Sequence, residues 1–279
     1  MKRRDFIKAI VPVGFLAGNV FSLATSSNAF EDIVVVKNEL PHLRFRKGIE
    51  EIGGIGRFVK KGQRVAIKPA MAYDQAPESG LNSNPLLVEE IIKQCRVAGA
   101  RSVSVFDHTI ESWTKCYKNS GIERIAKDAE ARVLPANNEM FYSEINLAEP
   151  QELKTVKIHN SILEADVFIN VAVARIDEKH GYLGSVKNLA GCIWSRQNIA
   201  LPGNDKAMAE LMYYIKPELT ILDSTDFQVL TTDCVAADSL AFQFLNRNTD
   251  NIEYLKIADE LGFGDSRIKV SDVRTLNPF

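Results

Sequence analysis

Lysine, histidine, asparagine, cysteine and glycine gather in one short stretch of the chain, KHGYLGSVKNLAGCIWSRQ, between residues 179 and 197. Lysine and asparagine side chains can bind anions and carbonyl groups, and glycine allows the backbone to approach a ligand closely. We therefore expect this stretch to be a loop that faces a small charged ligand. Its candidate ligand-binding residues are Lys179, His180, Lys187, Asn188 and Gly191.

Further polar residues follow apolar runs elsewhere in the chain. Lys68 and Arg175 add positive charge that would attract a phosphate, a carboxylate or another small anion. Asn84 stands before Pro85, and an asparagine before proline is typical of a helix N-cap. Asp107 or His108 is the candidate catalytic acid or base. The alternative for each lysine is an ordinary solvated surface charge.

Two other kinds of chemistry remain open. Cys192 and His180 could form a thiolate and imidazole pair, which makes Cys192 a third catalytic candidate, and a structural role for both is the alternative. Carboxylates could hold a divalent metal together with His108 or His180; they are Asp107, Asp223, Asp226, Asp233 and Asp238. The alternative is that they cap helices and close turns, and Asp233 is well placed to cap a helix that begins at Val235.

These residues can act together only if the fold brings them to one edge. Short, nearly continuous β-branched runs bounded by turn residues are typical of buried parallel strands, and they occur at 33–36, 65–67, 103–106, 167–171 and 219–222. Helical patterns occur at 84–98, 122–131, 205–215, 235–245 and 252–261. The alternation predicts an α/β fold with a mostly parallel open sheet, helices on both faces and a single main domain. Ligands bind such sheets beyond the carboxyl ends of the strands, so we expect the polar residues to share one rim.

Composition and charge argue against several classes of protein. The chain has 279 residues, of which 46% are hydrophobic and 25% charged, as is typical of globular proteins. A formal net charge of -2 and the lack of a basic run argue against a nucleic-acid partner. The four cysteines show no metal-type spacing. The motifs GxSxG, HExxH, GxGxxG and the P-loop are absent, which argues against the familiar hydrolases, zinc proteases and nucleotide-binding proteins.

The N-terminus has the organisation of an export signal. The basic start MKRRDFIK precedes the apolar run IVPVGFLAGNVFSLAT and the small residues before Phe30. The pair Arg3-Arg4 is similar to the twin-arginine consensus. We therefore expect a twin-arginine-type signal peptide at 1–29, a mature α/β domain at 30–279 and a periplasmic or otherwise exported protein. No later apolar run approaches the roughly 20 residues of a membrane span.

The motifs VAIKPAM, NSNPLLVEEIIKQCRVAGARSVSVFDHT, EADVFINVAVAR and SVKNLAGCIWSR follow one another in an order that resembles the domain of unknown function 362 family, in particular its exported members with twin-arginine signals. The likeness covers most of the mature chain. It implies an α/β domain whose reaction is not settled, joined in some members to ferredoxin-type iron-sulfur modules, and so implies a redox partner protein. By resemblance, the recurrent positions are Lys68-Pro69, Asn84-Pro85, Asp107, Lys187-Asn188 and Gly191. The resemblance therefore adds Asn84 to the predicted ligand-binding residues.

This chain also departs from the family pattern. Ala70 stands where asparagine is usual, and Arg175 and Asp177 stand where a lysine and a histidine are common. No ferredoxin-type cysteine motif occurs, so the spacing identifies no cofactor. The leading hypothesis is an exported α/β protein with a cationic cleft at the strand carboxyl ends, which binds a small anionic ligand or cofactor as a redox-associated enzyme. The alternative is a non-catalytic binding or accessory protein on the same scaffold.

Overall fold

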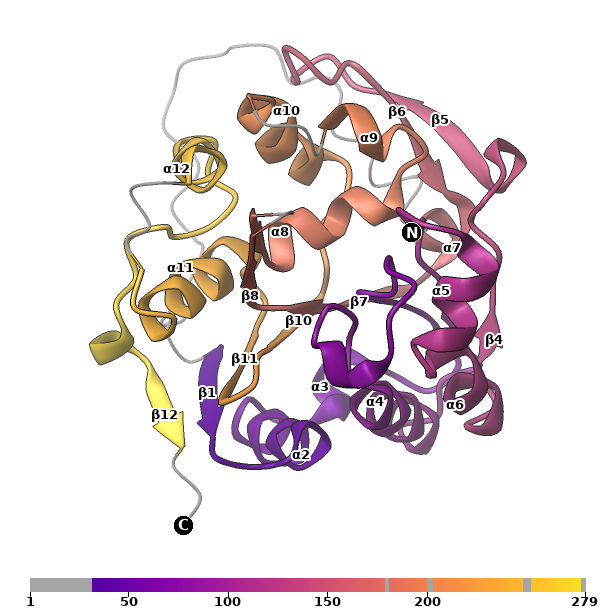
Figure 1. Ribbon diagram of the computed structural model, residues 1–279, viewed down its shortest axis with the longest axis vertical. Coiled ribbons are helices and arrows are strands. Elements are labelled where there is room, and N and C mark those ends of the chain that lie inside the picture. Colours follow the sequence, from indigo (N-terminus) through magenta and orange to yellow (C-terminus); the bar gives the residue numbers. More distant parts are fainter. Residues whose placement is uncertain (1–31, 179–180, 200–202, 248–251, 277–279) are drawn as a thin grey trace.

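A mixed eight-stranded sheet runs through the protein, whose computed structural model describes residues 32–178, 181–199, 203–247 and 252–276 (Figure 1). The strands lie in the order β12-β1-β11-β10-β7-β2-β3-β4. Their bounds are β1 Ile33–Lys37, β2 Arg64–Pro69, β3 Ser102–Val105, β4 Arg132–Val133, β7 Val167–Val173, β10 Leu219–Asp223, β11 Phe227–Thr231 and β12 Arg274–Leu276. Of these eight strands, β11 runs antiparallel to both neighbours and the other pairings are parallel. The prediction of a mostly parallel α/β sheet is confirmed.

The apolar runs expected to be strands are strands, with ends within two residues of those expected. Their β-branched side chains pack well on a pleated, buried surface. The prediction misses β4, β12 and β11 of this sheet, and it misses β11 because Gln228 interrupts the apolar run. The strand is buried nonetheless, and Gln228 Nε2 donates to the carbonyl of Pro41 at 3.1 Å and to Asp223 at 2.9 Å. A buried amide with partners thus replaces the expected apolar side chain.

Helices cover both faces of the sheet (Figure 1). One core cluster joins the sheet to α2 Pro41–Glu51, α4 Pro85–Val97, α5 Trp113–Asn119 and α6 Ile122–Asp128, with α3 Ile55–Phe58 packed beside it. The opposite cluster contains residues of α7 Asn160–Glu164, α8 Ser185–Asn188, α9 Arg196–Ile199, α10 Asp205–Glu210, α11 Cys234–Phe244 and α12 Glu253–Glu260. Short 3-10 turns are η1 Pro77–Ser79, η2 Glu139–Phe141, η3 Leu189–Cys192, η4 Leu211–Tyr213 and η6 Val270–Asp272.

The predicted helices are present, and the described part of the chain also contains α2, α3, α5, α7, α8 and α9. The expected helix at 205–215 divides into α10 and the 3-10 turn η4. The prediction misses α2 because its sequence, PHLRFRKGIEE, is largely polar. Gly48 explains how α2 packs closely, since a Cβ atom there would lie 2.6 Å from a methyl group of Leu230.

Strand order places a topological switch point between β2 and β7. From β2 the chain adds β3 and β4 on one side, and it then returns to β7 and adds β10 and β11 on the other side. The loops that leave the carboxyl ends of β2 and β7 therefore diverge, and in open α/β sheets such a crevice is the usual ligand site. The residues that follow these two strands are therefore the candidates for a ligand site.

Two small hairpins lie outside the main sheet. One pairs β5 Tyr142–Asn146 with β6 Thr155–His159, and both strands follow β4 in the sequence. The other pairs β8 Arg175–Asp177 with β9 Gly181–Leu183, directly after β7. Within the described part of the chain, no helix combines the length and apolar character needed to cross a membrane. The predicted signal peptide at 1–29 lies outside the described residues.

Candidate functional site

Lys68 and Asp107 come from two neighbouring strand segments and form a buried ion pair. Lys68 lies near the end of β2 and Asp107 lies just beyond β3, and the Nζ and Oδ1 atoms are 2.8 Å apart with both side chains almost fully buried. The Oδ2 atom of Asp107 accepts the backbone N–H of Met71 at 2.8 Å. Burial lowers the pKa of Lys68, and the charge of Asp107 opposes that shift. The two charges neutralise each other, so this pair adds little to a positive field around it.

Asn188 on α8 holds the ion pair to the neighbouring strand. Its Oδ1 atom accepts from Lys68 Nζ at 2.6 Å, and its Nδ2 atom donates to Asn170 Oδ1 at 2.8 Å. Asn170 lies opposite Lys68 in the register of β2 with β7, and its own amide donates to the carbonyl of Ser185 at 3.0 Å. Asn170 is outside the set expected from sequence, and the signal that points to it is a lone amide inside an apolar strand.

Gly191 allows η3 to cross directly over the ion pair. A Cβ atom at this position would lie 2.2 Å from Asp107 Oδ1 and 2.4 Å from Lys68 Cε, closer than any side chain can approach. The carbonyl of Gly191 also accepts the backbone N–H of His108 at 3.1 Å. Close packing therefore requires glycine at position 191, as expected where the backbone approaches other groups closely.

Asp238 on α11 fixes the start of α8. Its carboxylate accepts the backbone N–H groups of Ser185 at 2.6 Å and Val186 at 3.0 Å, and the hydroxyl of Tyr182 at 3.2 Å. Burial raises the pKa of Asp238 to about 6, and these hydrogen bonds oppose the shift. An acidic side chain at the N-terminus of a helix satisfies its first N–H donors and complements its dipole. Asp238 thereby positions α8, which carries Lys187 and Asn188.

The ring of His108 lies in an aromatic cluster beside the ion pair. It stacks on Trp194 with ring centroids 5.1 Å apart and planes inclined by 3°, and its Nδ1 atom lies 2.8 Å from the carbonyl oxygen of Ile193. Burial lowers the pKa of His108. Arg196 donates a hydrogen bond to the backbone carbonyl of His108. These contacts hold the loop after β3 against α9.

His159 belongs to the same cluster and is kept neutral by its burial. Its ring stacks on Phe106 with centroids 4.2 Å apart, its Nδ1 atom accepts the backbone N–H of Ser161 at 3.2 Å, and its Nε2 atom lies 3.1 Å from the carbonyl oxygen of Pro135. Burial lowers the pKa of His159 to about 4. The hydrogen bond with Pro135 opposes this shift, so burial is the effect that favours the neutral ring.

We expect His159 to make the protein less stable in mild acid. Its folded-state pKa lies below that of an unfolded histidine, about 6.5, so its contribution is complete above that pH and is lost as the pH falls toward 4. The loss should reach about 3 kcal/mol. His159→Asn keeps an N-cap acceptor but does not titrate, so its urea-unfolding free energy should fall less between pH 7 and 4.5. Parallel curves for the two proteins would contradict this assignment.

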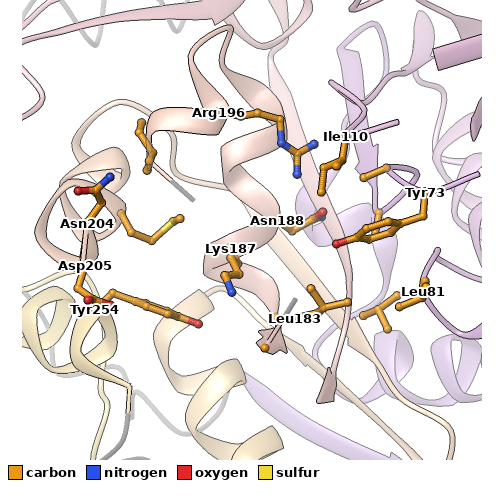
Figure 2. Close-up of a pocket in the computed structure, with 17 residues that line it drawn as sticks. Tyr73, Leu81, Ile110, Leu183, Lys187, Asn188, Arg196, Asn204, Asp205 and Tyr254 are labelled. Carbon is orange, nitrogen blue, oxygen red and sulfur yellow. The ribbon is translucent and has the colours of Figure 1, made fainter. Parts of the chain in front are cut away.

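A cavity of about 470 Å³ opens beyond the ends of β2 and β7 (Figure 2). Most of its lining is apolar, and polar side chains enter it from several elements. The lining residues are Ala70, Ala72, Tyr73, Leu81, Ile110, Val173, Gly181, Leu183, Gly184, Lys187, Asn188, Arg196, Ile199, Asn204, Asp205, Met208 and Tyr254. Its position matches the crevice that the strand order predicts.

Lys187 and Arg196 bring positive charge to the cavity from α8 and α9. Lys187 is half-buried, its Nζ atom donates to the carbonyl of Tyr182 at 3.1 Å, and burial lowers its pKa against the opposing charges of Asp205 and Asp238. Arg196 is 9% exposed. Lys187 reaches the cavity, whereas Lys68 lies in the ion pair with Asp107, so the two lysines do not form one cationic surface.

Tyr254 on α12 lines the cavity, and its buried hydroxyl has no hydrogen-bond partner among the described residues. The residue is 6% exposed. Figure 2 shows its ring directed toward Lys187. The site residues expected from sequence do not include Tyr254, Asn204, Asp205 and Arg196. These residues reach the cavity only because of how α9, α10 and α12 pack.

Other expected site residues have different surroundings. Asn84 caps α4, since its side chain accepts the N–H groups of Leu86 at 2.9 Å and Leu87 at 3.4 Å. Arg175 is exposed on β8 and donates to the carbonyl of Ser79, which ties the β8–β9 hairpin to η1. Lys179 and His180 lie outside the described residues, and so does a pairing of Cys192 with His180. Cys192 itself is buried.

The aspartates considered as metal ligands are dispersed. Asp233 caps α11, as expected, through the N–H groups of Val235 at 2.8 Å and Ala236 at 2.9 Å. Asp223 pairs with the buried Arg44 at 3.0 Å, and Asp238 caps α8. Across the residues described, no group of three or more His, Cys, Asp or Glu side chains is arranged to hold a metal ion.

Two of the solved structures that this chain resembles show how distant the likeness is. One is the lactate racemase apoprotein from Thermoanaerobacterium thermosaccharolyticum, with a TM-score of 0.48 and 10% identity over 72% of this chain and 54% of that chain. The other is a protein from Thermotoga maritima, with a TM-score of 0.36 and 12% identity over 60% of this chain and 46% of that chain.

Comparison with known sequences gives both a relative and a family. A thylakoid-associated protein from Synechocystis sp. is 22% identical over 183 residues, which make up 63% of this chain and 56% of the relative. The chain therefore matches little more than half the length of that relative. Residues 65–233 match the family model described as domain of unknown function (DUF362), and this match covers more than half of the chain. The protein therefore belongs to the DUF362 family.

Proposed function

We propose that this protein is an exported member of the family that binds a small organic anion with an apolar body in the cavity beyond β2 and β7. The observation that carries the proposal is the entry of two cationic side chains, Lys187 and Arg196, into an otherwise mostly apolar cavity. The proposal of export rests on the twin-arginine-like pair Arg3-Arg4 and the apolar run after it.

The charge at the cavity favours an anion. Lys187 and Arg196 are cationic, and Asp205 is the acidic residue of the lining. Hydrogen bonds between charged groups are roughly twice as strong as neutral ones, and they gain strength where water is excluded. A carboxylate or phosphate between the two cations would therefore be held more strongly than a neutral group.

The walls favour an apolar body next to the charged group. Leu81, Ile110, Leu183 and Met208 contribute apolar side chains to the lining. The volume of about 470 Å³ falls within the range of about 300–1,000 Å³ that is common for small-molecule sites. A molecule with one ring or a short chain and a single acidic group matches both the size and the polarity.

The residues expected to move protons are engaged in the packing of the fold. Asp107 is paired with Lys68, His108 is stacked on Trp194, and Cys192 is buried. None of the three is part of the cavity lining. Their positions support ligand binding as the function in preference to proton transfer by these residues.

Isothermal titration calorimetry with a matched pair of probes tests this proposal. 3-Phenylpropionate carries a carboxylate, and 3-phenyl-1-propanol carries a neutral hydroxyl on the same apolar body. We expect the carboxylate to bind at least about tenfold more tightly, because a hydrogen bond to a charged group contributes roughly 1.5–3 kcal/mol. Lys187→Met should reduce that preference.

The control is Lys93→Met, which removes an exposed lysine that pairs with Glu89 on α4 at 3.0 Å. This variant should keep the wild-type preference for the carboxylate. Equal affinities for the acid and the alcohol, or no binding of the acid at millimolar concentration, would contradict the proposed function.

A further inference from the structure

We propose that Lys187 captures an oxo acid covalently, as an imine between its ε-amine and the carbonyl carbon of the ligand, while Arg196 holds the carboxylate of the same ligand. This inference rests on the proposed function, because it places the ligand in the same cavity and names its chemical class. An oxo acid combines the two groups that these two side chains recognise.

The amine of Lys187 is held at the wall of the cavity. Its Nζ atom donates to the carbonyl of Tyr182 at 3.1 Å, and it lies 3.9 Å from the Cβ position of Gly181, another lining residue. Asp238 fixes the helix that carries Lys187. The amine therefore has a defined position, as a nucleophile that attacks a bound carbonyl must have.

Lys187 is cationic in the free cavity, and its amine must lose a proton before it attacks the carbonyl. Burial lowers its pKa, so a larger fraction of the amine is unprotonated near neutral pH than on an exposed lysine. Burial also lowers the pKa of Lys68, but that amine is bound to Asp107 and Asn188 outside the cavity lining. Lysines in apolar pockets with a lowered pKa are well suited to imine formation.

Arg196 is suited to hold the carboxylate. A guanidinium group has N–H donors in a planar fork that matches the two oxygens of a carboxylate. One of these donors is bound to the carbonyl of His108, which fixes the orientation of the fork at the cavity. Figure 2 shows Arg196 and Lys187 directed into the same cavity, with Asn188 between them.

The reaction balances without an oxidant or reductant. The neutral amine adds to the carbonyl carbon to give a carbinolamine; the nitrogen then loses a proton, the carbon–oxygen bond breaks, and one water leaves as the carbon–nitrogen double bond forms. Asp205 lines the cavity and can accept the proton from nitrogen and return it to the departing hydroxyl. The Tyr254 hydroxyl, which has no hydrogen bond among the described residues, can donate to the ligand oxygen.

Reductive trapping of the full protein tests the inference. The probes are phenylpyruvate and 4-oxopentanoate, in which the carbonyl lies next to the carboxylate or further from it. Each is incubated with the protein and sodium cyanoborohydride near neutral pH, and the modified peptides are mapped by mass spectrometry. We expect the reduced adduct of at least one probe to form about tenfold faster at Lys187 than at exposed lysines, because the cavity holds the carbonyl of the bound probe beside this amine.

Competition and substitution complete the test. Excess 3-phenylpropionate should suppress the adduct at Lys187, and Lys187→Met and Lys187→Gln should remove it, whereas Lys93→Met should leave it unchanged. Adducts spread over exposed lysines, with no excess at Lys187 for either probe, would overturn the inference. If no adduct formed at Lys187 but 3-phenylpropionate still bound more tightly than the alcohol in a way that depends on Lys187, only the covalent step would be refuted. If 3-phenylpropionate also failed to bind, the proposed function would be refuted as well.

Discussion

Gly191→Ala is expected to destabilise the protein by about 3–5 kcal/mol, the range observed when a buried ion pair is broken. The new methyl group would occupy space 2.2 Å from Asp107 Oδ1 and 2.4 Å from Lys68 Cε. Either the ion pair must separate in the interior or η3 must rise from the sheet. Lifting η3 would also weaken the hydrogen bond from His108 N–H to the carbonyl of Gly191.

Urea unfolding followed by circular dichroism measures this effect, with Gly56→Ala as the matched control. A Cβ atom at Gly56 on α3 would meet no atom within 4 Å, and its φ lies outside the left-handed region. The control should therefore unfold close to wild type. A Gly191→Ala protein as stable as the control would show that η3 does not pack against the ion pair in solution.

Lys68→Met is the second substitution with a large expected effect. It leaves the carboxylate of Asp107 buried without its cation, and this should cost about 3–5 kcal/mol of unfolding free energy. The Oδ1 atom of Asp107 has no hydrogen bond to another donor among the described residues. Replacing Asp107 by Asn in the same protein removes the charge and keeps an acceptor for the N–H of Met71.

A double-mutant cycle separates the interaction from the cost of each single change. The variants are Lys68→Met, Asp107→Asn and the combination of both, and the double variant should recover much of the stability that Lys68→Met loses. The exposed pair Lys127 and Glu123 on α6, 2.6 Å apart, is the control and should couple by less than about 1 kcal/mol. Equal coupling in the two pairs would contradict the buried ion pair.

The sheet is largely predictable because its signals are local. Runs such as 167–171 are short, apolar and β-branched, and a parallel strand buried on both faces needs that composition. Two of the elements that the sequence pattern does not predict, β11 and α2, are missed for a common reason. Gln228 in β11 and Arg44 in α2 are polar but buried, because each donates a hydrogen bond to Asp223. Asp223 is far from Arg44 in the sequence and lies across the β10–β11 turn from Gln228.

The candidate site is predictable in its place and less so in its chemistry. The meeting of Lys68 with Asp107 follows from parallel strands that end at one edge. Their mutual neutralisation depends on η3 and Asn188 covering them, and no local pattern reports that packing. The same limit applies to Arg196 and Tyr254, which reach the cavity from helices whose positions are set by tertiary packing.

Asn84 illustrates how one residue pattern can indicate two roles. The dipeptide Asn84-Pro85 predicts a helix start, and the structure has that start, with the side chain bound to backbone N–H groups of α4. Its inclusion in a ligand-binding set rests on the family resemblance. Because the carbonyl oxygen of the side chain is already used by two donors, the capping role is the one that the contacts support.

A crystal structure of the protein with 3-phenylpropionate would locate both parts of the ligand in the cavity. We expect the carboxylate to lie within hydrogen-bond distance of Lys187 Nζ or the Arg196 guanidinium, with the ring among Leu81, Ile110 and Met208. Ligand density outside this cavity, or a carboxylate directed into solvent away from both cations, would contradict this expectation.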